Sequence, residues 1–134
     1  MSRILVIEDQ KDVRAMICMV LRVNHFEVID APSAAAGQKL FEESSFDVAI
    51  VDVFLEDANG FDVVARMRAR VPDMPVVVMS GMTSMTTVSP SADPPDLVCL
   101  QKPFRPNELI GAIQAALARG GRNDSASLAA RAAV

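Results

Sequence analysis

Polar side chains that could bind a metal ion and a phosphoryl group stand after the apolar runs of this sequence. They are three carboxylates, one hydroxyl and one ammonium: Glu8, Asp9, Asp52, Ser80 and Lys102. Taken singly, each has a plainer interpretation, because acidic and hydroxyl side chains at strand ends often cap helices or form turns. Those plainer interpretations do not explain why groups of complementary charge follow four of the five apolar runs.

Three carboxylates brought close together repel one another, which raises their pKa values and destabilises the site. A Mg²⁺ ion removes this problem, since it takes oxygen ligands in octahedral geometry and commonly uses carboxylates, waters and a substrate phosphate. Three carboxylates, one Mg²⁺ and the Lys102 ammonium sum to about zero formal charge. The set of residues therefore predicts a Mg²⁺ site suited to a phosphoryl group.

Five strands are predicted to bring these residues together. Three apolar runs are continuous rather than alternating, which is typical of strands buried on both faces of a parallel sheet. These are Ile4–Ile7, Val48–Val51 and Val76–Met79, and two weaker candidates are Phe26–Ile29 and Leu97–Leu100.

Segments of helical period alternate with the strands. One spans Val13–Leu21, a second follows Ser33 as N-cap, a third covers Gly60–Arg70, and the last runs from Pro106 until Gly120 and Gly121 end it. Strict alternation predicts a doubly wound α/β fold, a parallel sheet with helices on both faces. In such a sheet ligands bind at the carboxyl ends of the strands, where the polar side chains above would gather.

A further helix is expected between the fourth and fifth strands, in residues 82–96. This segment reads MTSMTTVSPSADPPD, and its prolines 90, 94 and 95 are incompatible with a regular helical ladder. We therefore predict a fourth helix that is short or irregular.

Composition excludes several classes of protein. The chain has 134 residues, which suits one domain, with 51% hydrophobic and 22% charged residues, a globular balance. A net charge of −4 without a basic patch argues against nucleic-acid binding, and no apolar run approaches the roughly 20 residues of a membrane span. Acidic residues come too early for a signal peptide.

Cys18 and Cys99 are isolated and each is predicted to be buried. We predict a cytoplasmic protein.

Taken together and in order, the motifs resemble the receiver domain of bacterial two-component response regulators. They are the pair Glu8-Asp9, the stretch Asp52–Gly60, the pair Ser80-Gly81 and the triplet Lys102-Pro103-Phe104. The resemblance covers about Arg3–Arg119 and implies a flavodoxin-like sheet of five strands in the order 2-1-3-4-5. It divides the chain into a receiver domain, 1–119, and a flexible or partly helical tail, 120–134.

The resemblance also assigns roles to the polar residues. Asp52 would be the phosphoacceptor, and Lys102 and Ser80 would contact the phosphoryl group. Mg²⁺ would be held by Asp9, Asp52 and the backbone carbonyl of Phe54, with Glu8 acting through water. The Lys102–Pro103 peptide bond would be cis.

Partners follow from the same resemblance. A sensor histidine kinase or a histidine phosphotransfer protein would supply the phosphoryl group, and an unidentified protein would receive the signal; homodimer formation is left open. The chain is expected to be a receiver without an output domain. It would be a phosphoacceptor rather than an enzyme, although it takes part in its own phosphorylation and slow dephosphorylation. His25 is predicted to be a surface turn residue.

Two departures from the family pattern and two alternative functions accompany this interpretation. Glu56 stands where the family usually has proline, and Cys99 where it usually has an aromatic residue. One alternative is an aspartyl-nucleophile phosphohydrolase of the haloacid dehalogenase type, but Phe54 occupies the place of its second aspartate. The other is a pseudo-receiver, an unphosphorylated interaction module, which would be marked by loss of the acceptor or the metal ligands.

Overall fold

One parallel sheet forms the centre of the molecule. The structure is a computed structural model that describes residues 2–81 and 97–123, the last four through their backbone alone. Its strands are β1 (Arg3–Ile7), β2 (Glu27–Ala31), β3 (Val48–Asp52), β4 (Val76–Ser80) and β5 (Val98–Gln101). They lie in the order β2-β1-β3-β4-β5, with every pair parallel. The predicted doubly wound, flavodoxin-like fold is confirmed, and its strand order reverses between β1 and β3.

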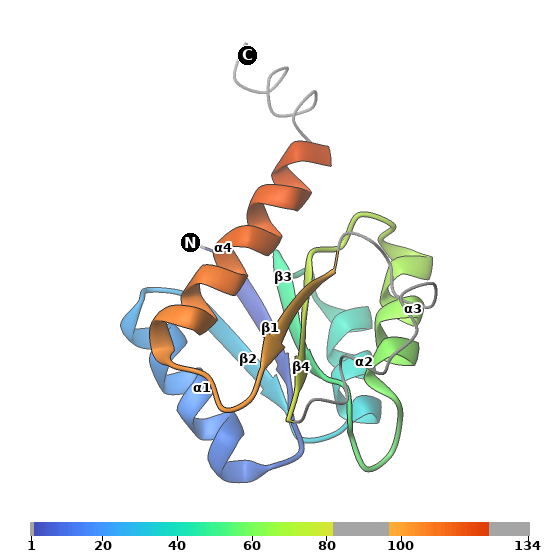
Figure 1. Cartoon of the computed structure of the whole chain (residues 1–134). Coiled ribbons are helices and arrows are strands. Elements are labelled where there is room, and N and C mark those ends of the chain that lie inside the picture. The colour runs from blue at the N-terminus through green and yellow to red at the C-terminus, as the bar shows by residue number, and fades with distance from the viewer. Residues whose placement is uncertain (1, 82–96, 124–134) are drawn as a thin grey trace.

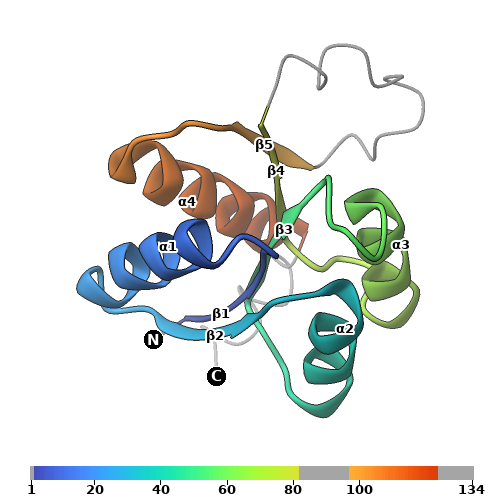
Figure 2. The same ribbon diagram turned by 90° about the horizontal axis from the view of Figure 1, so that it is seen from below.

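Helices cover both faces of this sheet. They are α1 (Lys11–Val23), α2 (Ala34–Glu43), α3 (Gly60–Arg70) and α4 (Pro106–Asn123). Figures 1 and 2 show α1 and α4 on one face and α2 and α3 on the other. None of these described helices combines the length and the apolar composition that crossing a bilayer requires.

The central strands have no exposed face, which explains their continuous apolar runs. Successive residues of a strand point to opposite faces, so each run supplies both halves of the core. Ile4 and Val6 pack beneath α1 and α4, whereas Leu5 and Ile7 pack beneath α2 and α3. All five residues of β3 and all five of β4 are buried. The polar residues at the ends of these strands are therefore held by a rigid frame.

Local signals place most element boundaries correctly. The Ser33 hydroxyl accepts a hydrogen bond from the Ala36 N–H at 3.1 Å, which confirms the predicted N-cap of α2. The limits of α3 agree with those predicted. The second strand is displaced: it begins at Glu27 and continues through Asp30 to Ala31. As an edge strand with partly exposed residues, β2 lacks the continuous apolar run that marks the central strands.

Two predictions were wrong. Gly120 and Gly121 do not end the last helix, because α4 continues to Asn123; glycine weakens a helix by about 1 kcal/mol but does not block it as proline does. Cys99 is exposed rather than buried, because it lies on the opposite face of edge strand β5 from the buried Leu100. The predicted short or irregular helix in 82–96 lies outside the described residues. The division into a domain, 1–119, and a tail, 120–134, stays a prediction.

His25 forms the turn that ends α1, as predicted for a surface turn residue. Its backbone is left-handed, with φ of 70°. The N–H of His25 donates to the carbonyl of Arg22, and the N–H of Phe26 donates to that of Leu21, both at 3.0 Å. This is a Schellman motif, whose left-handed position normally holds glycine. A residue with a Cβ atom is disfavoured in this conformation by about 1 kcal/mol.

Replacing His25 with glycine is expected to raise the free energy of unfolding by about 0.5 kcal/mol. The change relieves the left-handed Cβ contact, and the greater freedom of glycine in the unfolded chain offsets part of that gain. Urea denaturation would measure it, with His25→Ala as the control that keeps the Cβ atom. A His25→Gly variant no more stable than His25→Ala would contradict the expectation.

Candidate functional site

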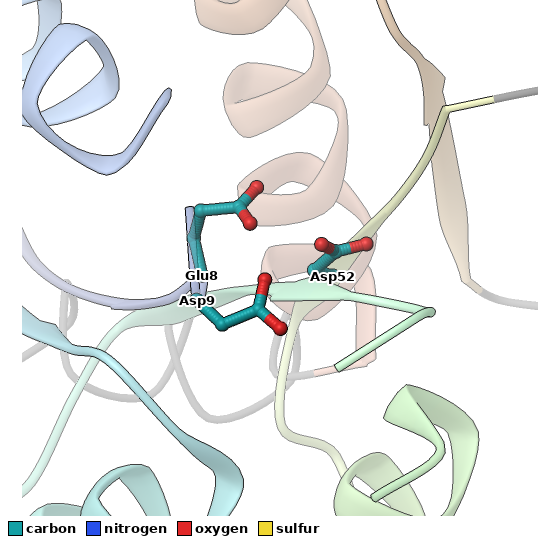
Figure 3. A group of neighbouring side chains, drawn as sticks. All are labelled: Glu8, Asp9 and Asp52. Atoms are coloured by element: carbon teal, nitrogen blue, oxygen red, sulfur yellow. The ribbon is translucent and has the colours of Figure 1, made fainter. Parts of the chain in front are cut away.

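Three carboxylates meet at the carboxyl edge of the sheet. Glu8 and Asp9 follow β1 directly, Asp52 is the last residue of β3, and β1 pairs with β3. One oxygen of each carboxylate lies within 4.8 Å of the other two. Figure 3 shows Glu8 and Asp9 extending from the end of β1 toward the side where Asp52 lies. Adjacent parallel strands thus bring together residues more than forty positions apart in the sequence.

Glu8 is the most enclosed member of the cluster, with a relative exposure of 0%. Its carboxylate accepts hydrogen bonds from the Lys102 ammonium at 2.6 Å and from the Gln10 N–H at 3.1 Å. Burial and, to a smaller extent, the neighbouring Asp52 raise the pKa of Glu8, whereas both of these hydrogen bonds lower it; the net result is a pKa of about 7. Glu8 therefore exchanges its proton near neutral pH.

Lys102 supplies the positive charge of the site from the end of β5. Its ammonium lies 2.6 Å from Glu8 and 3.2 Å from Asp52. Burial by itself lowers the pKa of Lys102, but its interactions with the two carboxylates outweigh that effect, and the net direction is upward. The side chain is thus an ammonium throughout the neutral range. The backbone N–H of Lys102 donates to the Ser80 carbonyl at 2.6 Å, and the Lys102–Pro103 bond is cis, as predicted.

Asp52 joins the buried charges to a surface pocket. The residue is 4% exposed; one of its oxygens accepts from the Phe54 N–H at 3.1 Å and the other faces Lys102. The pocket has a volume of about 350 Å³ and is lined by Asp9, Gln10, Asp52, Phe54, Glu56, Gly81 and Lys102. A small anion entering this pocket would meet both the Asp52 carboxylate and the Lys102 ammonium.

The predicted site residues divide into two groups. Four of them line the pocket: Asp9, Asp52, Phe54 and Lys102. Glu8 and Ser80 do not line it. The Glu8 carboxylate contacts the ammonium of Lys102, which does line the pocket, and Ser80 is fully buried at the end of β4.

Residues 53–59 link β3 to α3, and backbone hydrogen bonds close this loop. We call it the acceptor loop, because it follows Asp52, the predicted phosphoacceptor. Phe54 and Asn59 form an isolated antiparallel bridge, and the Gly60 N–H donates to the Val53 carbonyl at 2.8 Å. The Asn59 side chain caps α3 by accepting from the Phe61 N–H at 2.8 Å. A Cβ atom at position 60 would collide with the carbonyl oxygen of Asp52. Glycine at 60 thus allows α3 to begin against the end of β3.

Side chains of the acceptor loop alternate between the core and the surface. Val53 and Leu55 are buried among the residues beneath α2 and α3, whereas Phe54 is 56% exposed. This alternation fixes which way the loop backbone faces. Phe54 is also one of the residues that line the pocket.

Three contacts around the site were not predicted from the sequence. The Glu56 N–H donates to the Asp9 carboxylate at 2.9 Å, a bond that the usual proline would not make. The Asp57 carboxylate accepts from the N–H groups that begin α2. Arg14 donates to the Glu8 carbonyl at 2.9 Å and pairs with Asp30 at 3.0 Å. The replacement of the usual proline at position 56 was a sequence signal for the contact made by Glu56. No local sequence pattern indicates the contacts made by Asp57 and Arg14.

The carboxylate cluster has the dimensions of a Mg²⁺ site. Ligands on opposite sides of an octahedral Mg²⁺ lie about 4 Å apart, which matches a cluster whose oxygens all lie within 4.8 Å of one another. All three side chains offer the hard oxygen donors that this ion prefers. The residues present therefore fit Mg²⁺.

A comparison with protein families decides what kind of domain this is. The model of the response regulator receiver domain matches residues 4–114. The chain belongs to the response regulator receiver family. Receiver domains are phosphoacceptors of two-component signalling and bind Mg²⁺ at an acidic pocket, which agrees with the cluster described above.

Curated relatives of this receiver domain are longer proteins. It is 32% identical to the DNA-binding transcriptional regulator NtrC of Rhizobium meliloti over 124 residues, which are 92% of this chain and 26% of that protein. It is 35% identical to the sensory transduction protein RegX3 of Mycolicibacterium smegmatis over 133 residues, 94% of this chain and 55% of that protein. The chain thus spans only part of each of these relatives.

Solved structures share the fold of this receiver domain. A receiver domain protein from Clostridium thermocellum is 27% identical with a TM-score of 0.80, covering 89% of this chain and 96% of that one. A CheY-like receiver protein from Methanospirillum hungatei, 23% identical, has a TM-score of 0.81 and covers 92% and 98%. TrrA from Thermotoga maritima, described in complex with Mg²⁺ and BeF, is 23% identical with a TM-score of 0.77, covering 87% and 100%.

Proposed function

We propose that this receiver domain accepts a phosphoryl group from a phosphohistidine onto Asp52, with Mg²⁺ bound at the carboxylate cluster. One observation supports this most: Asp52 both lines the pocket and lies 3.2 Å from the Lys102 ammonium. A nucleophile placed beside a fixed positive charge suits phosphoryl transfer, where catalysis is mostly positioning and charge stabilisation. The complex of TrrA with Mg²⁺ and BeF supports the same chemistry here.

Each residue of the site has a defined part in this proposal. Asp9, Asp52 and the Phe54 carbonyl would hold the ion directly, and Glu8 would hold it through water. Mg²⁺, when bound, would offset negative charge on the transferring phosphoryl group. A carboxylate oxygen of Asp52 attacks phosphorus as the phosphorus–nitrogen bond breaks, and that electron pair returns to the imidazole. Lys102 then pairs with a phosphoryl oxygen, and Ser80, which is buried outside the pocket lining, must turn toward the group to hydrogen-bond it.

The proposed partners are proteins. A sensor histidine kinase or a histidine phosphotransfer protein supplies the phosphohistidine, and the phosphorylated domain changes its affinity for a target protein or passes the group along a phosphorelay. Phosphorylation shifts the conformational equilibrium only as far as it stabilises one conformation more than the other. Such partners place the proposed activity in the cytoplasm.

Incubation with phosphoramidate and Mg²⁺ followed by intact-mass measurement tests the function. One phosphoryl adduct is the expected result. Turnover of phosphoramidate without an adduct would instead support the phosphohydrolase, and neither adduct nor turnover would support the pseudo-receiver.

Mg²⁺ affinity is expected to rise with pH and to level off above about 7. Glu8 has its pKa raised to about 7, so below that pH a proton must leave before the carboxylate can help to hold the ion. Affinity should therefore fall by up to about tenfold for each pH unit below 7. Isothermal titration calorimetry at a series of pH values from 5.5 to 8.5, on both sides of the Glu8 pKa of about 7, would measure the Mg²⁺ affinity.

Glu8→Gln is the matched control for the pH dependence, because glutamine keeps the shape of the side chain and does not titrate. Its Mg²⁺ affinity should be weaker at high pH and nearly flat near neutral pH. A variant with the same pH slope as the wild type would show that Glu8 is not the titrating group.

A further inference from the structure

The tip of the acceptor loop is bonded to two other loops at the same edge of the sheet. The Glu56 N–H donates to the Asp9 carboxylate at 2.9 Å, in the loop after β1. The Asp57 carboxylate accepts from the N–H groups of Ala34 and Ala35 at 3.0 and 3.1 Å, at the start of α2. Neighbouring residues of one loop thus connect the segments that follow β1, β2 and β3.

Asp57 shares the capping of α2 with a residue of that helix's own N-terminus. The first N–H groups of a helix have no intrahelical acceptor. The Ser33 hydroxyl accepts from the Ala36 N–H, as an N-cap residue usually does. The Asp57 carboxylate accepts from the N–H groups of Ala34 and Ala35, which lie 23 and 22 positions before it in the chain. These backbone hydrogen bonds lower the pKa of the Asp57 carboxyl, so it is ionised at neutral pH. Its negative charge also suits the positive end of the helix dipole.

Asp57 lies close in the chain to two residues that determine where the proposed metal ligands lie. Phe54, whose carbonyl would be a ligand, lies three positions before Asp57 in the loop. Glu56, immediately before Asp57, holds the Asp9 carboxylate, which would be a second ligand. The buried Val53 and Leu55 anchor the first half of the loop, whereas Glu56 and Asp57 are exposed. Hydrogen bonds rather than burial therefore hold Glu56 and Asp57, although the next residue, Ala58, packs partly buried against the core.

We propose that Asp57 is a positioning residue of the phosphoacceptor site. By holding the acceptor loop against α2, it keeps the Glu56 N–H on Asp9 and the Phe54 carbonyl in place for the ion. This inference rests on the proposed function, because the metal-binding roles of Asp9 and Phe54 are part of that proposal. Without the tether, binding of Mg²⁺ must also order the loop tip, which weakens affinity.

Mg²⁺ titration by isothermal calorimetry of the wild type, Asp57→Ala and Ser33→Ala tests the proposal. Both variants remove a cap of α2, but Ser33 makes no hydrogen bond to the acceptor loop in the described part of the chain. Asp57→Ala should bind Mg²⁺ roughly tenfold more weakly, whereas Ser33→Ala should remain within about twofold of the wild type. Asp57→Asn, which keeps one acceptor oxygen, should recover part of the loss.

Amide hydrogen exchange without Mg²⁺ gives a second readout. Exchange in residues 53–59 should be faster in Asp57→Ala than in Ser33→Ala. Equal Mg²⁺ affinity in Asp57→Ala and the wild type would overturn the inference, as would an equal loss in Ser33→Ala, which would reflect helix stability alone. A wild type that bound no Mg²⁺ would refute the proposed function itself, and this inference with it.

Discussion

Replacing Asp52 with asparagine is expected to lower the rate of phosphoryl uptake from phosphoramidate by at least roughly a thousandfold. The amide is nearly isosteric with the carboxylate, and its oxygen can still accept from the Phe54 N–H or from Lys102. It is, however, a neutral and much weaker nucleophile. The fold should be kept, because the substitution also removes one of three neighbouring carboxylate charges. The loss would therefore be one of chemistry.

Intact-mass measurement after incubation with Mg²⁺ and phosphoramidate would quantify the adduct. Asp62→Asn is the matched control, since Asp62 is an exposed carboxylate in the first turn of α3 and does not line the pocket. It should be phosphorylated at the wild-type rate. If the Asp52→Asn variant gained the adduct as fast as the control, the phosphoacceptor would have to be another residue.

Replacing Lys102 with methionine is expected to destabilise the Mg²⁺-free protein by about 3 kcal/mol at pH 8. Methionine keeps much of the volume but leaves the fully buried Glu8 carboxylate without its ammonium partner at 2.6 Å. Below pH 6 the loss should shrink to about 1 kcal/mol, because Glu8 then takes up a proton and only the Asp52 carboxylate, 3.2 Å from the ammonium in the wild type, is left without its counter-charge. The sign follows from the raised pKa of Glu8: the folded state binds the extra proton, so acid favours it.

A double-mutant cycle isolates this interaction. Glu8→Gln combined with Lys102→Met should recover more than half of the stability lost in Lys102→Met, because the pair is removed together and the glutamine oxygen can still accept from the Gln10 N–H. Urea denaturation at pH 8 and pH 5.5, without Mg²⁺, would measure the four proteins. Additive effects at pH 8 would show that the ion pair contributes no coupling energy.

Sequence patterns predicted the frame of the site because that frame depends on burial. Residues 4–7, 48–51 and 76–79 have side chains on both faces of the sheet, so their continuous apolar character alone predicts central strands. Once those strands are parallel and the first lies beside the third, as the family resemblance implied, Asp52 must lie near Glu8 and Asp9, whatever their separation in the chain. Edge strand β2 was placed less accurately, because partial exposure allows polar residues such as Asp30 within it.

Contacts that depend on single hydrogen bonds were not predictable in this way. Asp57 is one of two acidic residues between β3 and α3, and nothing near it in the sequence marks the N–H groups of Ala34 and Ala35 as its partners. The full burial of Glu8, as opposed to the pocket-lining position of Asp9, likewise depends on how Lys102 crosses the sheet edge. The periodicity of apolar residues indicates which face of a helix or strand is buried, whereas these contacts depend on the geometry of the loops.

The ion pair between Glu8 and Lys102 joins residues 94 positions apart and has a consequence for biosynthesis. Carboxylates from β1 and β3 leave the ribosome long before Lys102, which follows edge strand β5, paired with β4. A nascent chain that ends before β5 would hold the acceptor without the cation that balances Glu8 and Asp52. The proposed transfer of a phosphoryl group to Asp52 should therefore become possible only after β5 has docked, so unfinished chains would not be phosphorylated.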